Sequence, residues 1–213
     1  MFMTETISKL DKLFDELNGH YFGGELPTPV ITVQTTPRAY GHCSRDKIWT
    51  AENDARYEIN LAAEYLTRPI ENTAATLVHE MVHLWCRLKD IKETSQSGRY
   101  HNNLFRVEAE KRGLSISYDS TVGWSLTQPA EDLKQVLREL GYTEGFKMAR
   151  GLPGRRKTAP AGSAPEGGEI ETAPKVRNKQ KKYTCPCCGQ FVKSAQELNI
   201  MCGVCKEPMT AED

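Results

Sequence analysis

One segment, residues 73–85, constrains the fold of this chain more than any other part of the sequence. It reads TAATLVHEMVHLW, in which His79 and His83 are four residues apart and Glu80 lies between them. On an α-helix this spacing places both imidazoles on one face, one turn apart. Polar side chains in a buried helix are costly unless they are paired or bind a metal, so the segment predicts a metal-binding helix. The apolar residues that predict its burial are Leu77, Val78, Met81, Val82, Leu84 and Trp85.

The pattern His-Glu-x-x-His is typical of zinc hydrolases. In such enzymes zinc acts as a Lewis acid and lowers the pKa of a bound water to roughly 7. Glu80 is the residue expected to accept the proton of that water and return it to the leaving amine. Because the pattern has only three fixed positions, it also occurs by chance, and the interpretation depends on a further ligand.

A catalytic zinc ion usually takes three protein ligands and keeps one position open. His101, in RYHNNLF, is the leading candidate for the third ligand, because a polar loop at residues 90–99 lets the next helix pack antiparallel to the first. Glu108 and Glu110, farther along that predicted helix, are alternatives. The metzincin pattern is excluded, because cysteine and lysine stand where it needs glycine and histidine.

Cys43, in YGHCS, allows a different hydrolase. Peptide deformylases combine the same histidine pair with an upstream cysteine in a turn of this kind. The glutamine-rich and glycine-rich surroundings of that enzyme are absent here, so this alternative is weaker than His101. A third alternative assigns no catalysis: the histidine site is then structural, and the chain is an adaptor that binds nucleic acid or protein.

Five of the seven cysteines lie within residues 185–205. They include two Cys-x-x-Cys pairs separated by 13 residues, which is the layout of a four-cysteine zinc ribbon. With so little apolar sequence, this module is expected to fold only with metal bound. The predicted cofactors are therefore two zinc ions, one catalytic and one structural. The expected ligands of the structural zinc are Cys185, Cys188, Cys202 and Cys205.

The local sequence of the ribbon leads to three further expectations. Cys187 competes with Cys188 as a ligand, and the glycine that follows Cys188 favours the latter. Gly189 and Gly203 stand where each turn is expected to need a tight backbone. The segment QFVKSAQELNIM, between the cysteine pairs, is expected to supply two strands.

Residues 151–174 divide the chain. They contain five Gly, four Pro and four Ala with almost no large apolar side chain, so they cannot bury enough surface to offset the entropy of ordering. The sequence predicts a main domain at residues 1–150, a linker at 151–182 and the ribbon at 183–213. A chain of 213 residues with 38% hydrophobic content is long enough to bury a core in the main domain.

The end of the linker is basic. Residues 155–182 carry eight Lys or Arg against three Glu, and such a segment attracts phosphates with strong salt dependence. The whole chain has a formal net charge of zero, so this basic character is local. We therefore expect contacts with DNA, with single strands as one candidate form. The expected contact residues are Lys175, Arg177, Lys179, Lys181 and Lys182.

The sequence also indicates where the protein works. No apolar run approaches the roughly 20 residues needed to cross a bilayer. The start, MFMTETISKL, lacks the basic and apolar regions of a targeting signal. Clustered cysteines of metal-binding type favour a reducing compartment. We expect a cytoplasmic protein without membrane contact.

Hydrophobic spacing predicts the elements of the main domain. A first amphipathic helix is expected to end near Asn18 and Gly19. Strand-like segments then form a small antiparallel sheet, and three more helices follow. The strands are expected within residues 30–36, 39–44, 47–50 and 57–61, and the helices at about 72–89, 100–112 and 130–140.

Several segments, in order, resemble the SprT-like family of zinc metalloproteases, to which the Spartan-type DNA–protein crosslink proteases belong: FDELNGHYFGGELPTPVITV, YGHCS, TLVHEMVHLW, YHNNLFRVEAEKRG, YTCPCCG and MCGVC. The resemblance covers about residues 5–115 and 183–206. It implies that His79, His83 and His101 bind zinc, with Glu80 as general base in a minimal gluzincin-like α+β core. It further implies a zinc-dependent endopeptidase whose substrates are proteins bound or crosslinked to DNA.

Overall fold

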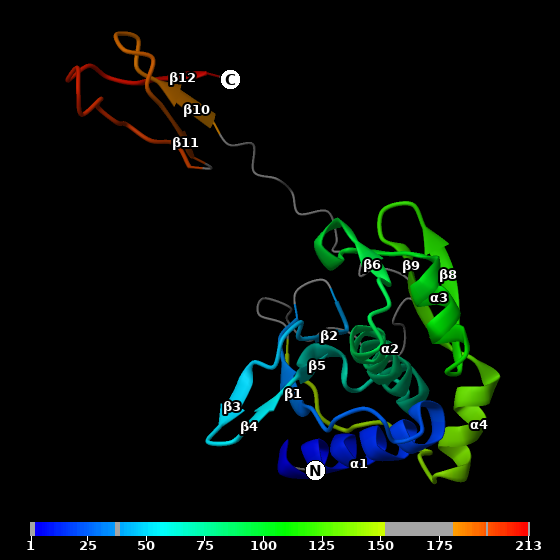
Figure 1. The fold of residues 1–213 in the computed structure, drawn as a ribbon. Helices are drawn as coiled ribbons and strands as arrows, with labels where there is room; N and C mark the ends of the chain where they lie inside the picture. The colour runs from blue at the N-terminus through cyan, green and yellow to red at the C-terminus, as the bar shows by residue number, and fades with distance from the viewer. Residues whose placement is uncertain (1–2, 37–38, 152–180, 195, 213) are drawn as a thin grey trace. The chain divides into compact units, whose positions relative to one another are not determined.

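The computed structural model describes residues 3–36, 39–151, 181–194 and 196–212 (Figure 1). The chain forms two compact units, one within residues 1–170 and the other within residues 171–213. The predicted linker at residues 151–182 lies mostly outside the described residues, so the three domain limits stay predictions. Among the described residues, no helix combines the length and the apolar character needed to span a membrane.

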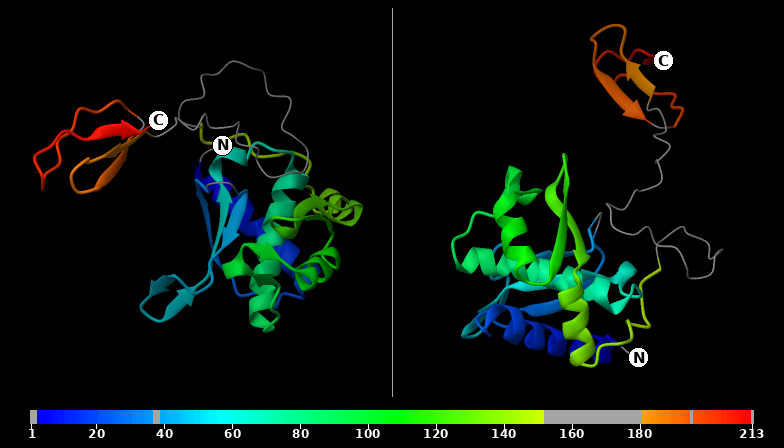
Figure 2. Two further views of the ribbon diagram at one scale, coloured as in Figure 1. Left: turned by 90° about the horizontal axis from the view of Figure 1, so that it is seen from above. Right: turned by 90° about the vertical axis from the view of Figure 1, so that its right-hand side faces the viewer.

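The helix that carries the histidine pair, α2 (Ile70–Leu88), runs through the middle of the first unit (Figures 1 and 2). Most of the predicted apolar face is buried: Leu77, Val78, Met81, Val82 and Leu84 are all inaccessible to solvent, whereas Trp85 is only partly buried. Around it lie α1 (Met3–Phe22), α3 (Asn103–Glu110) and α4 (Glu131–Glu139). This mixed α+β core agrees with the expected fold class.

A three-stranded sheet packs on one side of α2, in the order β1 (Val30–Gln34), β5 (Glu58–Ala62), β2 (Gly41–Cys43). The expectation of a purely antiparallel sheet is wrong, because β1 and β5 are parallel. Residues 35–57 separate these two strands, which is long enough to return the chain to the same end of the sheet. Only β2 is antiparallel to β5, and it forms an edge of the sheet.

Part of the predicted sheet forms a separate hairpin, β3 (Trp49–Ala51) with β4 (Asp54–Arg56). A second, four-stranded sheet was not predicted from the sequence. Its order is β6 (Thr94–Ser95), β7 (Tyr100–His101), β9 (Gly123–Pro129), β8 (Leu114–Asp119). The β8–β9 hairpin lies beside α2 and α3 in Figures 1 and 2.

Two helix boundaries differ from the prediction. α1 continues through Gly19 to Phe22, because the side chain of Asn18 does not end the helix but holds the backbone of Leu26 with two hydrogen bonds. The helix ends at Gly23 and Gly24, both at positive φ. The helix expected to begin at residue 100 begins at Asn103, since residues 100–101 form β7.

The second unit is a small antiparallel sheet in the order β11 (Phe191–Ser194), β10 (Lys181–Thr184), β12 (Thr210–Glu212). The expectation that residues 190–201 supply two strands is wrong. Among the described residues of this segment only β11 is a strand, and Met201 makes an isolated bridge with Pro208. The first cysteine turn therefore joins β10 to β11, and the second joins the bridge residues Met201 and Pro208.

Candidate metal centre

Three imidazoles converge where α2 meets β7. Nε2 of His83 lies 3.3 Å from Nε2 of His79 and 3.0 Å from Nε2 of His101. Their ligand atoms all lie within 4.8 Å of one another. Two nitrogens bound to one zinc ion at about 2.0 to 2.1 Å in tetrahedral geometry lie about 3.3 Å apart. The spacing of the three histidines is therefore that of a zinc site.

Different elements position the three rings. The helical repeat of α2 places His79 and His83 one turn apart. His101 comes from β7, whose backbone is fixed on both sides: it pairs with Thr94 of β6 and with Gly123 of β9. The next residue, Asn102, caps α3 by accepting hydrogen bonds from the first turn. His101 is thus held by a strand and a helix cap, not by the helix expected from the sequence.

The outer nitrogens of two rings have acceptors that fix their tautomers. The hydroxyl of Thr127 donates to Ser125 O, so its oxygen accepts from Nδ1 of His79 at 2.8 Å. The carboxylate of Glu93 accepts from Nδ1 of His83 at 3.1 Å. With the proton on Nδ1, both Nε2 atoms face each other as bare lone pairs. Two lone pairs at this distance repel unless a cation lies between them, so the donor set fits a metal ion.

Burial keeps the rings of His79 and His101 neutral, which is the state that binds a metal. It holds the pKa of His79 well below its usual range, and the neighbouring His83 and His101 lower it further. Burial, with His83, lowers the pKa of His101 to about 4. In the described part of the chain, Nδ1 of His101 is the one ring nitrogen of the cluster that is buried without a partner.

Glu80 lies next to the cluster, on the side of α2 that faces β2. Its Oε1 would lie 3.2 Å from a Cβ at Gly41, so only glycine leaves the present space for this carboxylate. The backbone amide of Cys43 donates to it from the outer edge of β2. Burial raises the pKa of Glu80, and His83 and His42 partly offset the increase. Such a carboxyl is suited to take up a proton.

The other candidate ligands lie elsewhere. The thiol of Cys43 is not among the clustered ligand atoms, and it accepts from Nη1 of Arg87 at 3.5 Å. Glu108 binds Trp85, Lys111 and Arg112, and Glu110 pairs with Arg106. The geometry therefore gives the deformylase alternative no support.

In the second unit, four thiols form another cluster. The ligand atoms of Cys185, Cys188, Cys202 and Cys205 lie within 4.8 Å of one another. Sγ of Cys188 and Sγ of Cys202 are 3.7 Å apart, close to the separation of about 3.8 Å expected for sulfurs on one tetrahedral zinc. In the described part of the chain, which includes all seven cysteines, every thiol is free. This donor set also fits zinc.

The two cysteine turns repeat one backbone pattern. Cys185 N donates to Gln190 O at 2.8 Å, and Cys202 N donates to Glu207 O at the same distance. The residue after each second cysteine is at positive φ, and these are Gly189 and Lys206. The expectation for Gly203 is wrong, because the turn needs its left-handed residue three positions later.

A comparison with protein families decides the assignment of the first unit. A model of the SprT-like family matches residues 10–118, which is more than half of the 213-residue chain. The chain belongs to the SprT-like family. SprT-like proteins are generally zinc-metallopeptidase-like, which agrees with the histidine cluster and Glu80. No curated protein and no solved structure matches the chain.

The SprT-like match ends before two features of the structure. Thr127, on β9, and the whole ribbon lie beyond residue 118. Thr127 and Glu93 are also the residues that sequence reasoning missed. Neither stands in a motif, and only the second sheet brings them to the rings of His79 and His83. In the sequence, nothing distinguishes this carboxylate and this hydroxyl from other polar residues.

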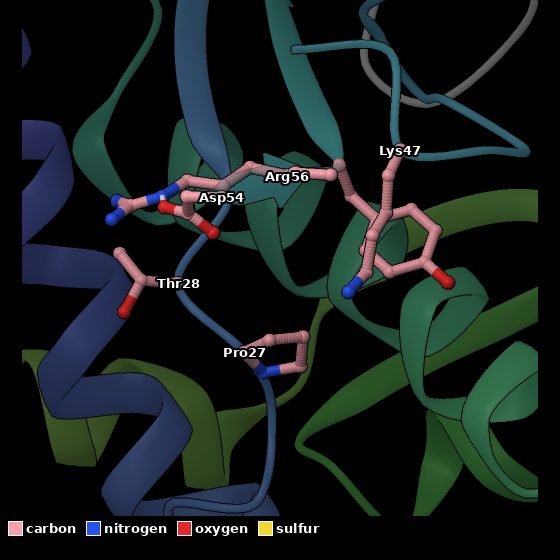
Figure 3. A pocket seen from close by; sticks show the side chains of 7 residues that line it. Pro27, Thr28, Lys47, Asp54 and Arg56 are labelled. Carbon is pink, nitrogen blue, oxygen red and sulfur yellow. Dashed lines mark hydrogen bonds and ion pairs between the residues drawn. The ribbon is translucent and has the colours of Figure 1, made fainter. Parts of the chain in front are cut away.

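The SprT-like unit has a pocket that residues of β4 help to line (Figure 3). Asp54 and Arg56 of β4 form an exposed ion pair at its edge. The lining residues include none of the clustered histidines and not Glu80, so we assign this pocket no role in catalysis. They are Pro27, Thr28, Lys47, Asp54, Ala55, Arg56 and Tyr57.

The residues expected to contact DNA are only partly described. Lys175, Arg177 and Lys179 lie outside the described residues. Lys181 and Lys182 lie in β10. Lys181 pairs with Glu197, and Nζ of Lys182 lies 5.2 Å from the ring centre of Phe191.

Proposed function

We propose that this SprT-like protein is a zinc-dependent endopeptidase. The observation that carries the proposal is the convergence of His79, His83 and His101 through Nε2, with the carboxylate of Glu80 beside them. Three protein nitrogens leave one position of a tetrahedral ion open, as in catalytic zinc sites. A structural site would instead use all four positions.

When bound, zinc supplies a Lewis acid that polarises the peptide carbonyl and acidifies water. The chain's own residues do the remaining work. Glu80 accepts a proton and passes it to the leaving amine, and its raised pKa suits this exchange. Glu93 and Thr127 keep His83 and His79 in the tautomer that presents Nε2.

We further propose that the substrates are proteins bound or crosslinked to DNA. The support is the resemblance to Spartan-type proteases and the basic sequence of residues 155–182. In this proposal the ribbon and the basic segment supply location, and the first unit supplies chemistry. Free thiols throughout the described part of the chain favour a reducing compartment, so we place this activity in the cytoplasm.

The test is cleavage of a DNA-binding protein by the zinc-loaded chain, with and without single-stranded DNA. Glu80→Gln is expected to abolish cleavage while it retains both zinc ions. Glu71→Gln is the matched control, because Glu71 lies on the same helix, is partly exposed and is not in the cluster. Equal cleavage by all three proteins would assign the activity to a contaminant. No cleavage by any of them, with both zinc ions bound, would favour a structural site in an adaptor.

A further inference from the structure

The partly exposed side chains of α2 form a stripe through the candidate metal centre. From Asn72 onward they recur every three or four residues, apart from Trp85 on another face. Residues with this spacing share one side of a helix. The stripe consists of Asn72, Thr76, His79, His83 and Arg87.

Strands lie on both sides of this stripe. A Cβ at Gly41 of β2 would lie 3.1 Å from Thr76 Cγ2 and 3.2 Å from Glu80 Oε1, so β2 lies against one side. On the other side, Thr127 of β9 contacts His79. A substrate polypeptide whose scissile carbonyl lies at the three histidines would run along the stripe, between β2 and β9.

Arg68 is fixed at the amino end of the stripe. Its Nη2 donates to Thr76 Oγ1 at 2.8 Å and its Nε donates to Tyr65 O at 3.1 Å. Its guanidinium carbon lies 3.8 Å from the ring centre of Tyr40, the residue before β2. Thr76 and Glu80 are four residues apart, about 6 Å along the helix axis. About two residues of extended polypeptide span that distance.

The charge of Arg68 is not neutralised within the described residues. It makes no ion pair there, whereas the arginines of α3 and α4, and the one that follows α3, each pair with a glutamate. Burial lowers the pKa of Arg68 to about 10, so the side chain remains charged at neutral pH. Its Nη1 makes no hydrogen bond with a described residue, which leaves donors for an incoming anion. The paired arginines are Arg106, Arg112 and Arg138.

A half-buried guanidinium without a counterion is costly, and a carboxylate is its best partner. We propose that Arg68, stacked on Tyr40 and anchored by Thr76, is a specificity-determining residue that binds a carboxylate of the polypeptide substrate about two residues from the scissile bond. The inference rests on the proposed peptidase function and adds a substrate preference to it. Two sources share this chemistry, an Asp or Glu side chain and the C-terminal carboxylate of a peptide.

The test compares cleavage of matched peptides by the full-length, zinc-loaded chain. Two pairs of amidated peptides are used, and within each pair one peptide carries Glu where the other carries Gln. This position lies two residues before the cleaved bond in one pair and two residues after it in the other. A further peptide has Gln and a free C-terminus. We expect the wild type to prefer the Glu peptide by about tenfold or more in kcat/KM, since the alternative leaves a partly buried charge unpaired. If the wild type prefers only the peptide with the free C-terminus, the carboxylate that Arg68 binds is the C-terminal one.

Arg68→Gln is expected to reduce this preference to about one, because cleavage of the Glu peptide falls by more than cleavage of the Gln peptide. Arg68→Glu should favour a Lys peptide instead, and Arg138→Gln on α4 is the control. An equal loss on both peptides, or an unchanged preference, would overturn the inference and leave Arg68 a structural residue. If Arg68→Gln does not fold, Arg68→Lys should retain part of the preference, and its loss there would count equally against the inference.

Failure of the proposed function would look different. In that case the wild type cleaves none of the peptides. Binding of the amidated Glu and Gln peptides to the Glu80→Gln protein, measured by fluorescence anisotropy, then still tests the subsite. Tighter binding of the Glu peptide that depends on Arg68 supports it, and equal binding rejects it.

Discussion

Glu93 contacts the metal centre in two ways. Its carboxylate accepts from Nδ1 of His83, and its backbone carbonyl accepts from the amide of Asn102 at 2.9 Å, directly after His101. Burial raises the pKa of this carboxyl, but the hydrogen bond from His83 lowers it, and the net pKa is below its usual range. Glu93 therefore stays charged at neutral pH and strengthens the ring of His83 as a ligand.

Replacing Glu93 should weaken zinc binding at the histidines. We expect Glu93→Ala to lower the zinc affinity of this centre by about 10- to 100-fold, as for other carboxylates that orient ligating histidines. Glu93→Gln, which keeps an acceptor but loses the charge, should fall between that variant and the wild type. Competition with a chelator measures the affinity. Glu110→Ala, which removes a surface partner of Arg106, is the control. An unchanged affinity in Glu93→Ala would show that His83 needs no such support.

Two thiols of the first unit should resist alkylation. Burial, with Glu80 nearby, raises the pKa of Cys43 to about 12, and burial, with Glu93, raises that of Cys86 to about 12. Both thiols therefore stay protonated at pH 8, and only the deprotonated thiolate reacts with iodoacetamide. We expect mass spectrometry to find neither alkylated by iodoacetamide until the protein unfolds.

The same shifts set a direction for stability. Above about pH 9, the ordinary pKa of a cysteine thiol, the unfolded chain begins to lose these protons while the folded chain keeps them. Their contribution to stability is therefore full below about pH 9 and is lost as the pH rises towards 12. Rapid labelling of native Cys43 at pH 8 would contradict the buried environment assigned to it.

At the scale of elements, the metal centre depends on one close contact between strands. β7 and β9 pair at His101 and Gly123, and a Cβ at Gly123 would lie 2.1 Å from His101 O. Gly123 is also at φ +76°. Only glycine allows β9 to approach the strand that carries His101 this closely.

Gly123→Ala should therefore displace His101 and empty the histidine centre. We expect the zinc content of the purified chain to fall from two ions to one, with the ribbon still loaded. Gly141→Ala is a matched control, because Gly141 has a similar φ of +82° with no atom within 4 Å of its would-be Cβ. Both variants carry backbone strain of about 1 to 2 kcal/mol, but only the first has the collision. Equal zinc contents would show that β9 can move aside.

In the ribbon, the second cysteine turn should improve with glycine. Lys206 stands at φ +60°, where Gly189 stands in the first turn. Lys206→Gly removes strain of about 1 kcal/mol, and because folding of this unit is coupled to metal, its zinc affinity should rise about fivefold. Chelator titration of the ribbon zinc measures this. Gly203→Ala should leave it unchanged, because its would-be Cβ meets no atom within 4 Å. A lower affinity in Lys206→Gly would indicate that the lysine side chain supports the turn.

The elements that the sequence predicted best are those whose signal is local. The apolar spacing of α2 predicted the helix that carries His79 and His83, and the two cysteine pairs predicted the four-thiol cluster, because each signal lies within a few residues. The parallel pairing of β1 with β5 depends on how a long connection returns, which no local pattern records. The β8–β9 hairpin was missed altogether, and with it Thr127. Glu93 contacts His83 and Asn102 because the chain turns back beside α2, and no motif in the sequence marks that approach.

At the scale of the whole molecule, the two ligand sets lie in separate compact units. The histidine centre and its hydrogen-bond partners lie within residues 41–127. The first of these residues belong to β2, beside Glu80, and the last is Thr127. The four thiols lie between residues 185 and 205. No described residue is shared by the two centres, so each should bind its ion independently.

Metal removal should accordingly be separable. We expect two zinc ions per chain in the wild type and one in either Cys202→Ser or His83→Ala, since each change removes one ligand from a different unit. Thermal unfolding of Cys202→Ser should retain the transition of the first unit, because the histidine centre and its core are intact. Its cleavage of a DNA-free protein should match the wild type, while stimulation by DNA is lost. Loss of both ions in Cys202→Ser, measured by elemental analysis, would contradict independence and would show that the ribbon supports the histidine centre.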